Sequence, residues 1–287
     1  MNIGVIGSGT MGNGIAHVFS LYNHRVILVD INETILNNAL DIIVKNLNRQ
    51  FKKNHITESN MKSAINNIEL SSSIEDLSNC DLIVEAVKED FKIKSEIFQR
   101  LDNICNDKTI FASNTSSISI NDLSSKLMRK DKFIGMHFMN PVPIMKLVEI
   151  IKGNKTSSET IAFIEKLSTS IDKVPVQCND SPGFVSNRIL MPMINEAAYC
   201  YMEGVAEPKA IDSIMKLGMG HPMGPLRLAD LIGIDVCVYI LNVLYDGLKD
   251  EKYKPCPLLN DMIKKNKLGN KTKEGFYNYE LWINRWA

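Results

Sequence analysis

Short apolar segments recur through the first 180 residues of the chain, with helical stretches between several of them. Many of these segments are nearly unbroken in Val, Ile, Leu or Phe, which is typical of strands covered on both faces. They lie at residues 3–6, 25–29, 81–84, 109–112, 133–138, 146–151 and 173–176. The helical stretches lie at residues 10–22, 32–53, 88–103 and 157–169. This alternation predicts an α/β fold of the Rossmann type, with a doubly wound, mainly parallel sheet.

The pattern changes after the Ser-Pro-Gly sequence at residues 181–183. Beyond it there are few strand candidates, and Pro182 and Gly204 suit the start and the end of a helix. The helices predicted here lie at residues 183–203, 207–217, 223–247 and 256–265. We therefore predict an α/β domain over residues 1–180 and an all-α C-terminal domain over residues 181–287.

A glycine-rich turn joins the first predicted strand to the first predicted helix. Gly7, Gly9 and Gly12 form a G-x-G-x-x-G pattern, and Asp30 closes the next apolar segment 18 residues after Gly12. Such glycines permit a sharp turn, close approach of backbone to a pyrophosphate, and close packing of helix on strand. A glycine-rich turn alone would be weak evidence, but strand, helix and acid together predict a dinucleotide site. Its residues are Gly7, Ser8, Gly9, Thr10, Met11, Gly12 and Asp30.

Asp30 also indicates which dinucleotide binds. A carboxylate at the end of the second strand can accept hydrogen bonds from ribose hydroxyls and would repel a 2′-phosphate. No arginine follows it in Ile31-Asn32-Glu33. The predicted cofactor is therefore NAD.

After Asp30 the chain enters a long helical insertion over about residues 32–66, which we call the basic insertion. Its basic side chains are Lys45, Arg49, Lys52, Lys53, His55 and Lys62. Charge alone leaves two interpretations open: a solvated helical face, or a contact site for a polyanion near the cofactor.

Residues 131–151 contain the candidate acid–base pair. His137 and Glu149 lie in two strand-like segments, and Asn-Pro-Val-Pro at residues 140–143 interrupts the chain between them. If the chain reverses at residue 143, the two side chains are equidistant from the turn and face each other across antiparallel strands. A carboxylate beside an imidazole fixes its tautomer and stabilises the imidazolium, as a proton shuttle requires. The alternative is a core histidine near an incidental glutamate.

Two further polar clusters stand where a buried substrate would need them. Residues 113–117, Ser-Asn-Thr-Ser-Ser, follow a predicted strand, and ligands of open parallel sheets bind at such strand ends. Asn187 lies near the start of the first helix of the second domain. Turns and helix caps favour the same residue types, so neither cluster is specific by itself.

Composition excludes several other classes of protein. The 287 residues include 33 basic and 33 acidic side chains, so no net charge attracts nucleic acid or an anionic membrane. No apolar stretch approaches the ~20 residues of a membrane span, and Asn2 already begins a strand, so we expect no leader peptide. The six cysteines lack metal-type spacing, and we expect a cytoplasmic protein without a structural metal.

At this point the sequence resembles the 3-hydroxyacyl-CoA dehydrogenases, and among them the bacterial 3-hydroxybutyryl-CoA dehydrogenases. The resemblance covers essentially the whole chain. It is carried by the glycine turn at 7–12, FASNTSS at 111–117, GMHFMNPVPIMKLVEII at 135–151, DSPGFVSNRIL at 180–190 and MGHPMGP at 219–225.

The resemblance implies roles for individual residues. His137 would be the general acid/base and Glu149 its partner, while Ser116 and Asn187 would hydrogen-bond the substrate. Contacts to NAD are implied for Glu89, Lys94, Ser116, Asn140 and Lys271, and Lys53 would contact the nucleotide of CoA. The implied reaction is reversible NAD(H)-dependent interconversion of (S)-3-hydroxyacyl-CoA and 3-ketoacyl-CoA, such as acetoacetyl-CoA, by a homodimer joined through the C-terminal domain.

Three departures from the family pattern stand out. Asn46 replaces a frequent serine on the insertion, Arg227 stands where an acid is usual, and residues 280–287 extend the usual terminus. Trp282 and Trp286 in that extension could cover an apolar patch.

Two other functions remain open at this stage. One is a dehydrogenase of a free hydroxy acid such as gulonate, although a free acid offers no distant phosphates to the basic insertion. The other is a redox sensor that binds NAD without turnover, which has no need of a proton shuttle.

Overall fold

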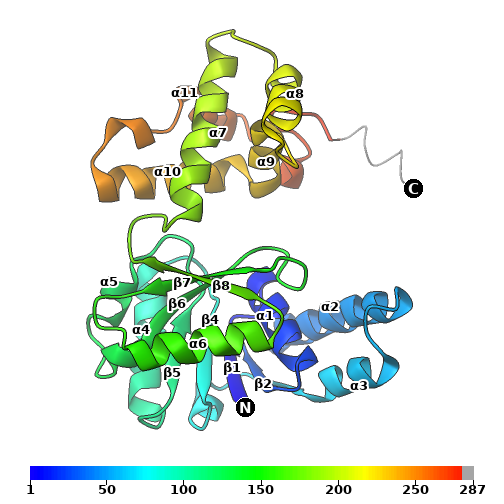
Figure 1. Cartoon of the computed structure of the whole chain (residues 1–287), viewed down its shortest axis with the longest axis vertical. Helices are drawn as coiled ribbons and strands as arrows, with labels where there is room; N and C mark the ends of the chain where they lie inside the picture. The colour runs from blue at the N-terminus through cyan, green and yellow to red at the C-terminus, as the bar shows by residue number, and fades with distance from the viewer. Residues whose placement is uncertain (280–287) are drawn as a thin grey trace. The chain divides into compact units, whose positions relative to one another are not determined.

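The computed structural model describes residues 1–279 (Figure 1). The chain forms two compact units, Met1–Ser181 and the part that begins at Pro182. Trp282 and Trp286 lie outside the described residues.

The first unit is built on one sheet of eight strands in the order β3-β2-β1-β4-β5-β6-β7-β8. Neighbouring strands are parallel, except that β6 and β7 are antiparallel. The strands are β1 Asn2–Ile6, β2 Arg25–Val29, β3 Ile68–Ser71, β4 Leu82–Glu85, β5 Ile110–Ser113, β6 Phe133–Phe138, β7 Leu147–Lys152 and β8 Val174–Asn179. The predicted doubly wound, mainly parallel α/β fold is confirmed.

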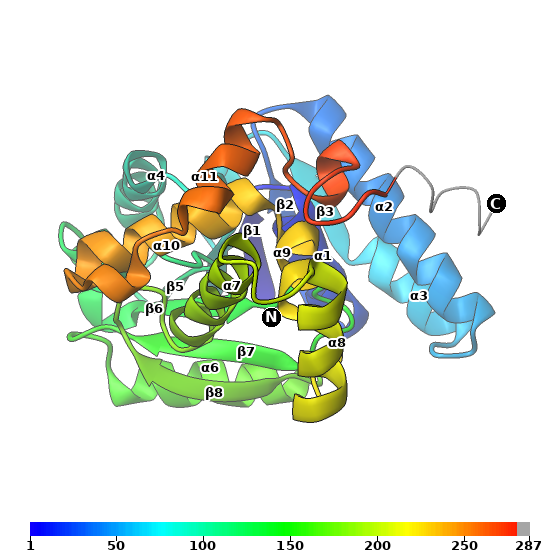
Figure 2. The same cartoon turned by 90° about the horizontal axis from the view of Figure 1, so that it is seen from above.

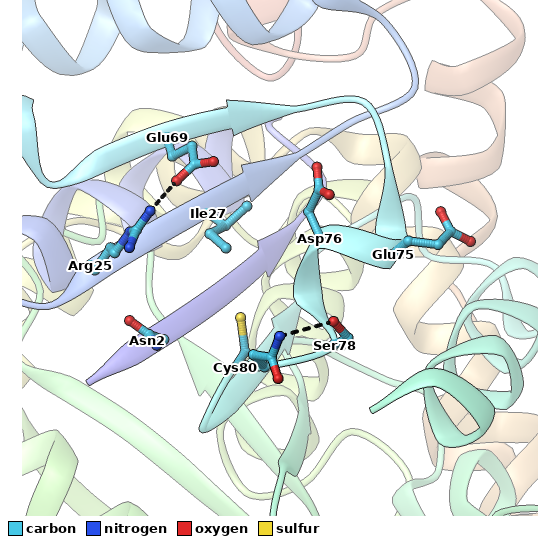
Figure 3. A pocket seen from close by; sticks show the side chains of 9 residues that line it. Asn2, Arg25, Ile27, Glu69, Glu75, Asp76, Ser78 and Cys80 are labelled. Atoms are coloured by element: carbon cyan, nitrogen blue, oxygen red, sulfur yellow. Dashed lines mark hydrogen bonds and ion pairs between the residues drawn. The ribbon is translucent and has the colours of Figure 1, made fainter. Parts of the chain in front are cut away.

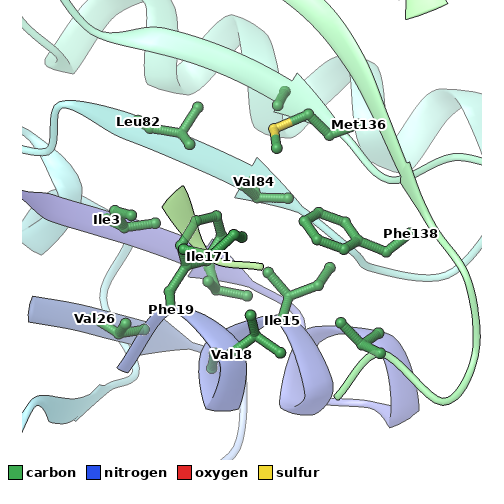
Figure 4. Close-up of a cluster of buried hydrophobic side chains, with 14 of the residues drawn as sticks. Ile3, Ile15, Val18, Phe19, Val26, Leu82, Val84, Met136, Phe138 and Ile171 are labelled. Atoms are coloured by element: carbon green, nitrogen blue, oxygen red, sulfur yellow. The ribbon is translucent and has the colours of Figure 1, made fainter. Parts of the chain in front are cut away.

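Helices cover both faces of this sheet. They are α1 Thr10–Leu21, α2 Glu33–Lys52, α3 Glu58–Asn66, α4 Phe91–Ile104, α5 Ile120–Ser124 and α6 Ser158–Ser170. On one face, Ile15 and Phe19 of α1 pack with Ile3, Val84 and Phe138 of the strands (Figure 4). The core follows from the central strands β1, β4, β5 and β6, which are buried on both sides of the sheet, whereas the predicted strand β8 is mostly exposed at the sheet edge.

The basic insertion consists of α2 and α3, which lie side by side in both views (Figures 1 and 2). Its return strand β3 was not predicted from the sequence. The strand has only four residues, mostly half-buried, at the edge of the sheet. A short edge strand lacks the long apolar run that identified the others.

The described part of the second unit is built from helices, as predicted: α7 Ser186–Met202, α8 Pro208–Met219, α9 Pro225–Ile232, α10 Ile234–Leu248 and α11 Pro257–Lys264. Isolated β-bridges join Glu274 to Gly269 and to Asn278. The single helix predicted over residues 223–247 is wrong. Gly233 has a φ of 107°, and the chain bends by 98° between α9 and α10. Likewise α7 begins at Ser186 and not near Pro182, because Gly183 and Phe184 adopt positive φ values.

Among the described residues no single helix is long and apolar enough to cross a membrane, although the bent pair α9 and α10 passes on length and composition together.

Candidate active site

The glycine turn is shaped to receive a phosphate group. Gly7 has a φ of 91°, and a Cβ there would lie 2.7 Å from the carbonyl oxygen of Ala86. A Cβ on Gly12 would lie 1.7 Å from the carbonyl oxygen of Gly7, so close packing of α1 on the turn requires glycine. Around Gly9 nothing lies within 4 Å of such a Cβ. Gly9 is the N-cap of α1 and provides no side-chain cap, so the first N–H groups of α1 are open to a pyrophosphate.

Asp30 is held in place at the carboxyl end of β2. The backbone N–H and the hydroxyl of Ser8 donate to Oδ2 of Asp30 at 2.7 and 2.8 Å, and the N–H of Ile31 donates to Oδ1 at 2.8 Å. A carboxylate has about four lone-pair sites, so capacity remains for ribose hydroxyls. The turn and Asp30 together fit NAD, which would be held by the α1 amides and this carboxylate.

A cavity of about 330 Å³ opens beside this turn. Ser8, Gly9 and Thr10 line it together with Asn140 and Asn46. The structure therefore brings Asn140, which the resemblance links to NAD, next to the glycine turn. Met11 is half-buried and packs against the apolar core of the unit.

His137 and Glu149 form a buried pair, which we call the dyad. His137 on β6 is paired in register with Glu149 on β7, and Nδ1 of the imidazole lies 2.7 Å from Oε2 of the carboxylate. The antiparallel register expected from the turn is observed. An ionised carboxylate only accepts hydrogen bonds, so this contact fits the imidazole tautomer with its hydrogen on Nδ1.

The loop after β5 is gathered around one carboxylate oxygen. Oε1 of Glu89 accepts hydrogen bonds from the hydroxyls of Thr115, Ser116 and Ser117, at 2.6, 3.3 and 2.9 Å. It also accepts the N–H groups of Ser116 and Ser117 at 3.0 and 3.1 Å. Burial alone would raise the pKa of Glu89, but Lys94 and these donors outweigh it and hold that pKa below its ordinary value.

Lys94 lies beneath this loop with an exposure of only 1%. Its ammonium is 2.6 Å from Oε1 of Glu85 and 3.3 Å from Oε2 of Glu89. Glu85, at the end of β4, also accepts the hydroxyl of Ser113 at 2.6 Å, and burial raises its pKa. We call Glu85, Glu89, Lys94, Ser113 and residues 115–117 the Lys94 network.

Sequence reasoning missed Glu85, the most buried acid of this network. The available signal was an acid that directly follows the apolar residues Leu82-Ile83-Val84, at a strand end where ligands bind.

The basic insertion borders a larger cavity of about 630 Å³. Arg49, Lys53 and His55 line it from the insertion, and Lys146 lines it from the segment before β7. Asn46 contributes to this cavity and to the one beside the glycine turn. Lys53 follows α2 directly as its C-cap residue.

Another cavity, of about 330 Å³, lies at the amino-terminal ends of β1 and β2, where Asn2 and Arg25 begin these strands (Figure 3). Arg25 and Glu69 form an ion pair of 2.8 Å there, and Cys80 also lines the cavity. None of the predicted site residues lines it.

The remaining predicted residues belong to the second unit. Asn187 is the second residue of α7 and is buried. Nζ of Lys271 donates to Asp235 at 2.6 Å. Arg227 stacks over the ring of Tyr279, with 4.2 Å from Cζ to the ring centre, and donates to Asn270 at 3.1 Å. These contacts give Arg227 a structural role within the unit.

Two family models match the chain. The NAD-binding domain of 3-hydroxyacyl-CoA dehydrogenase matches residues 2–181, and the C-terminal domain of 3-hydroxyacyl-CoA dehydrogenase matches residues 183–279.

Relatives of nearly equal length match as well. A probable 3-hydroxybutyryl-CoA dehydrogenase of Deinococcus radiodurans is 49% identical over 97% of this chain and 100% of its own length. A 3-hydroxybutyryl-CoA dehydrogenase of Clostridioides difficile is also 49% identical, over 97% of this chain and 99% of its own. The crystal structure of (S)-3-hydroxybutyryl-CoA dehydrogenase from Ralstonia eutropha superimposes with a TM-score of 0.94 at 45% identity, covering 97% and 99% of the two chains. The chain is an NAD-dependent dehydrogenase that belongs to the 3-hydroxyacyl-CoA dehydrogenase family.

Proposed function

We propose that the chain interconverts (S)-3-hydroxyacyl-CoA and 3-ketoacyl-CoA, with 3-hydroxybutyryl-CoA and acetoacetyl-CoA as its four-carbon pair. The printed names of the Clostridioides and Ralstonia proteins support this substrate. The observation that carries the proposal is the buried contact of 2.7 Å between His137 and Glu149, at the end of a sheet that also holds the NAD turn.

NAD, when bound, accepts or supplies the hydride. In the reductive direction the imidazolium of His137 donates a proton from Nε2 to the oxygen that develops negative charge on C3 of the substrate. In the oxidative direction neutral His137 takes the hydroxyl proton at the same nitrogen. Glu149 keeps Nδ1–H oriented and offsets the positive charge of the imidazolium.

Ser116 and Asn187 are proposed to bind the substrate oxygens. The hydroxyl of Ser116 lies within the Lys94 network, whose contacts fix the backbone on both sides of it. Donors held in this way stabilise charge on the 3-oxygen without reorganising during the reaction. Asn187 would add an amide donor toward the 3-oxygen or the thioester.

Lys53 and its basic neighbours are proposed to meet the phosphates of CoA. The cavity of about 630 Å³ beside α2 carries Arg49, Lys53, His55 and Lys146 on its walls. A free hydroxy acid has no phosphate to place there, which favours the CoA ester over the free-acid alternative.

The test compares turnover of the CoA ester with turnover of free hydroxy acids, each monitored by the absorbance of reduced nicotinamide. Acetoacetyl-CoA should oxidise NADH in the presence of the wild-type chain, and higher ionic strength should weaken binding of the ester. Turnover of free 3-hydroxybutyrate or gulonate as efficient as that of the ester would contradict the proposal. Binding of NADH without any turnover would instead establish the redox sensor.

We further propose a symmetric dimer formed through the second unit. Ile214, Leu217 and Met219 of α8 are exposed, with Leu217 at 87%, and Val205 and Leu231 are exposed as well. Apolar surface of this kind commonly marks a contact with another protein, and two-fold dimers are the commonest assembly. Light scattering should report a dimer for the wild-type chain and a monomer for Leu217→Glu; a wild-type monomer would contradict this.

A further inference from the structure

We propose that Glu85 is a positioning residue for the reaction: through Lys94 and Glu89 it fixes the loop that carries Ser116. The inference rests on the proposed function and extends it to a residue that would touch neither substrate nor cofactor.

Glu85 joins three segments at the carboxyl ends of β4 and β5. Its Oε1 accepts hydrogen bonds from the ammonium of Lys94 at 2.6 Å and from the N–H of Val87 at 2.7 Å. Its Oε2 accepts the hydroxyl of Ser113 at 2.6 Å, and its backbone oxygen accepts the N–H of Asn114 at 2.8 Å. Every partner donates, so the site requires an acceptor on both side-chain oxygens.

Lys94 transmits this order to Glu89. Its ammonium is buried between the carboxylates of Glu85 and Glu89 and also donates to the carbonyl of Val87 at 3.4 Å. A buried ammonium needs close counter-charges, and the two carboxylates at 2.6 and 3.3 Å restrict where Nζ can lie. Oε2 of Glu89 is thereby held, which leaves Oε1 turned toward the loop.

Glu89 then sets the conformation of residues 115–117. Five donors of this loop converge on Oε1, among them the N–H and the hydroxyl of Ser116. A rotation of the Glu89 carboxylate would displace all five contacts together. The orientation of Ser116 therefore depends on the Glu85 carboxylate, which reaches it through the two intervening residues Lys94 and Glu89.

A second arm leads from Glu85 toward the dyad. The N–H of Asn114 is bound by the backbone of Glu85, and Oδ1 of Asn114 accepts the N–H of Phe138 at 2.9 Å. Phe138 follows His137 directly on β6. This arm passes through the backbone of residue 85 and should persist in Glu85→Gln, so only the loop that holds Ser116 depends on the Glu85 side chain.

The test is Glu85→Gln, which preserves the shape of the side chain. Its amide nitrogen would face one of the donors now bound to Glu85, so the network cannot be fully satisfied. We expect kcat with acetoacetyl-CoA to fall by about 10- to 100-fold, as for a small misplacement of a catalytic group. Because NAD contacts are implied for Glu89, Lys94 and Ser116, kcat is measured at saturating NADH, so that any loss of cofactor affinity is separated from the fall in kcat.

Two controls separate positioning from general destabilisation. Glu75→Gln alters an exposed acid paired with Arg100 on the surface and should leave kcat unchanged. Leu167→Ala opens a cavity in the α6 core and should lower stability without lowering kcat at 25 °C. Hydrogen exchange adds a local readout: in Glu85→Gln the amides of Ser116 and Ser117 should exchange faster, while those of β1 should not change.

Wild-type kcat in folded Glu85→Gln, or unchanged exchange at Ser116 and Ser117, would overturn the inference. If Glu85→Gln does not fold, Ser113→Ala removes one contact of Glu85 together with the hydroxyl that accepts the N–H of Thr115, and should give a smaller fall in kcat; an unchanged kcat there would also overturn the inference. If the wild-type chain does not turn over acetoacetyl-CoA while it binds NADH, the proposed function fails instead, and the exchange experiment still tests whether Glu85 orders the loop.

Discussion

The dyad and the Lys94 network lie at the same end of the sheet but are assembled in different ways. The dyad needs two residues, His137 and Glu149, on adjacent antiparallel strands joined by one turn. The Lys94 network collects its side chains from β4, α4, β5 and the segments after these strands. The difference teaches that groups proposed to move a proton can be placed by one local turn, whereas groups that hold a loop depend on the order of strands in the sheet.

The largest expected effect concerns the dyad and tests whether it carries the chemistry. Glu149→Gln keeps a hydrogen-bonding side chain but removes the charge opposite the imidazolium. We expect the rate of acetoacetyl-CoA reduction to fall by about 10²- to 10⁴-fold, with little change in the urea concentration at the unfolding midpoint. Steady-state kinetics measure it, with Glu159→Gln on the exposed side of α6 as the control. Equal rates for Glu149→Gln and the wild type would reduce the dyad to a structural contact.

The free energy of unfolding should depend more on the Lys94 network than on the dyad, the reverse of their expected effects on rate. Lys94→Met leaves the buried Glu85 and the half-buried Glu89 without their shared cation, which should lower the free energy of unfolding by about 3–5 kcal/mol. The matched variant Lys146→Met breaks the exposed ion pair with Asp172 and should cost less than about 1 kcal/mol. Urea unfolding compares the two. Equal losses would mean that burial does not distinguish the network from a surface pair.

A buried histidine outside both groups sharpens the comparison through pH. His17 on α1 lies 3.2 Å from the amide nitrogen of Gln50, and its Nδ1 has no hydrogen-bond partner within residues 1–279. Burial, and then the charge of Lys173, lowers the pKa of His17 from 6.5 to about 4. Between these values the unfolded chain binds more protons, so stability is complete above pH 6.5 and falls as the pH drops toward 4.

This shift corresponds to about 3 kcal/mol. The variant His17→Gln should therefore lose less stability than the wild type between pH 6.5 and 4. The same carboxylates titrate in both proteins, so subtracting the two stability curves removes their contribution. The exposed His55→Gln should behave like the wild type. Parallel curves for the wild type and His17→Gln would show that His17 is not buried in its neutral form.

The smallest effect is expected far from the reacting carbon. Lys53→Met should raise KM for acetoacetyl-CoA by about fivefold, close to 1 kcal/mol, and should reduce its dependence on salt, while kcat stays the same. Lys62→Met, on the exposed face of α3 beside Glu58, is the control. A fall in kcat with unchanged KM would assign Lys53 to the chemistry rather than to binding.

The elements that sequence predicted best are those with long, uniform signals. Seven of the eight strands followed from short apolar runs, whereas β3 was missed because its four residues, Ile-Glu-Leu-Ser, form no such run. Residues 223–247 were predicted as one helix because their apolar pattern continues on both sides of Gly233, although the helix ends there and a second one begins. One glycine does not reveal in sequence whether it bends the chain.

The site residues likewise divide into those that local spacing predicts and those that it does not. The contact between His137 and Glu149 followed from their equal distance to one turn. Glu89 and Lys94 were identified only by resemblance, and Glu85 was not identified at all. These three residues lie within ten positions of one another, but their contacts to Ser113 and residues 115–117 depend on β4 lying beside β5 in the sheet, which no local spacing encodes.

The most direct test of the dyad is a single-turnover experiment with His137→Ala. The variant and the wild type are each loaded with NADH and mixed with acetoacetyl-CoA, and the absorbance of reduced nicotinamide is followed. The account predicts that NADH binding is retained and that its oxidation slows by about 10²- to 10⁴-fold. A folded variant that oxidises NADH at the wild-type rate would contradict the role of His137.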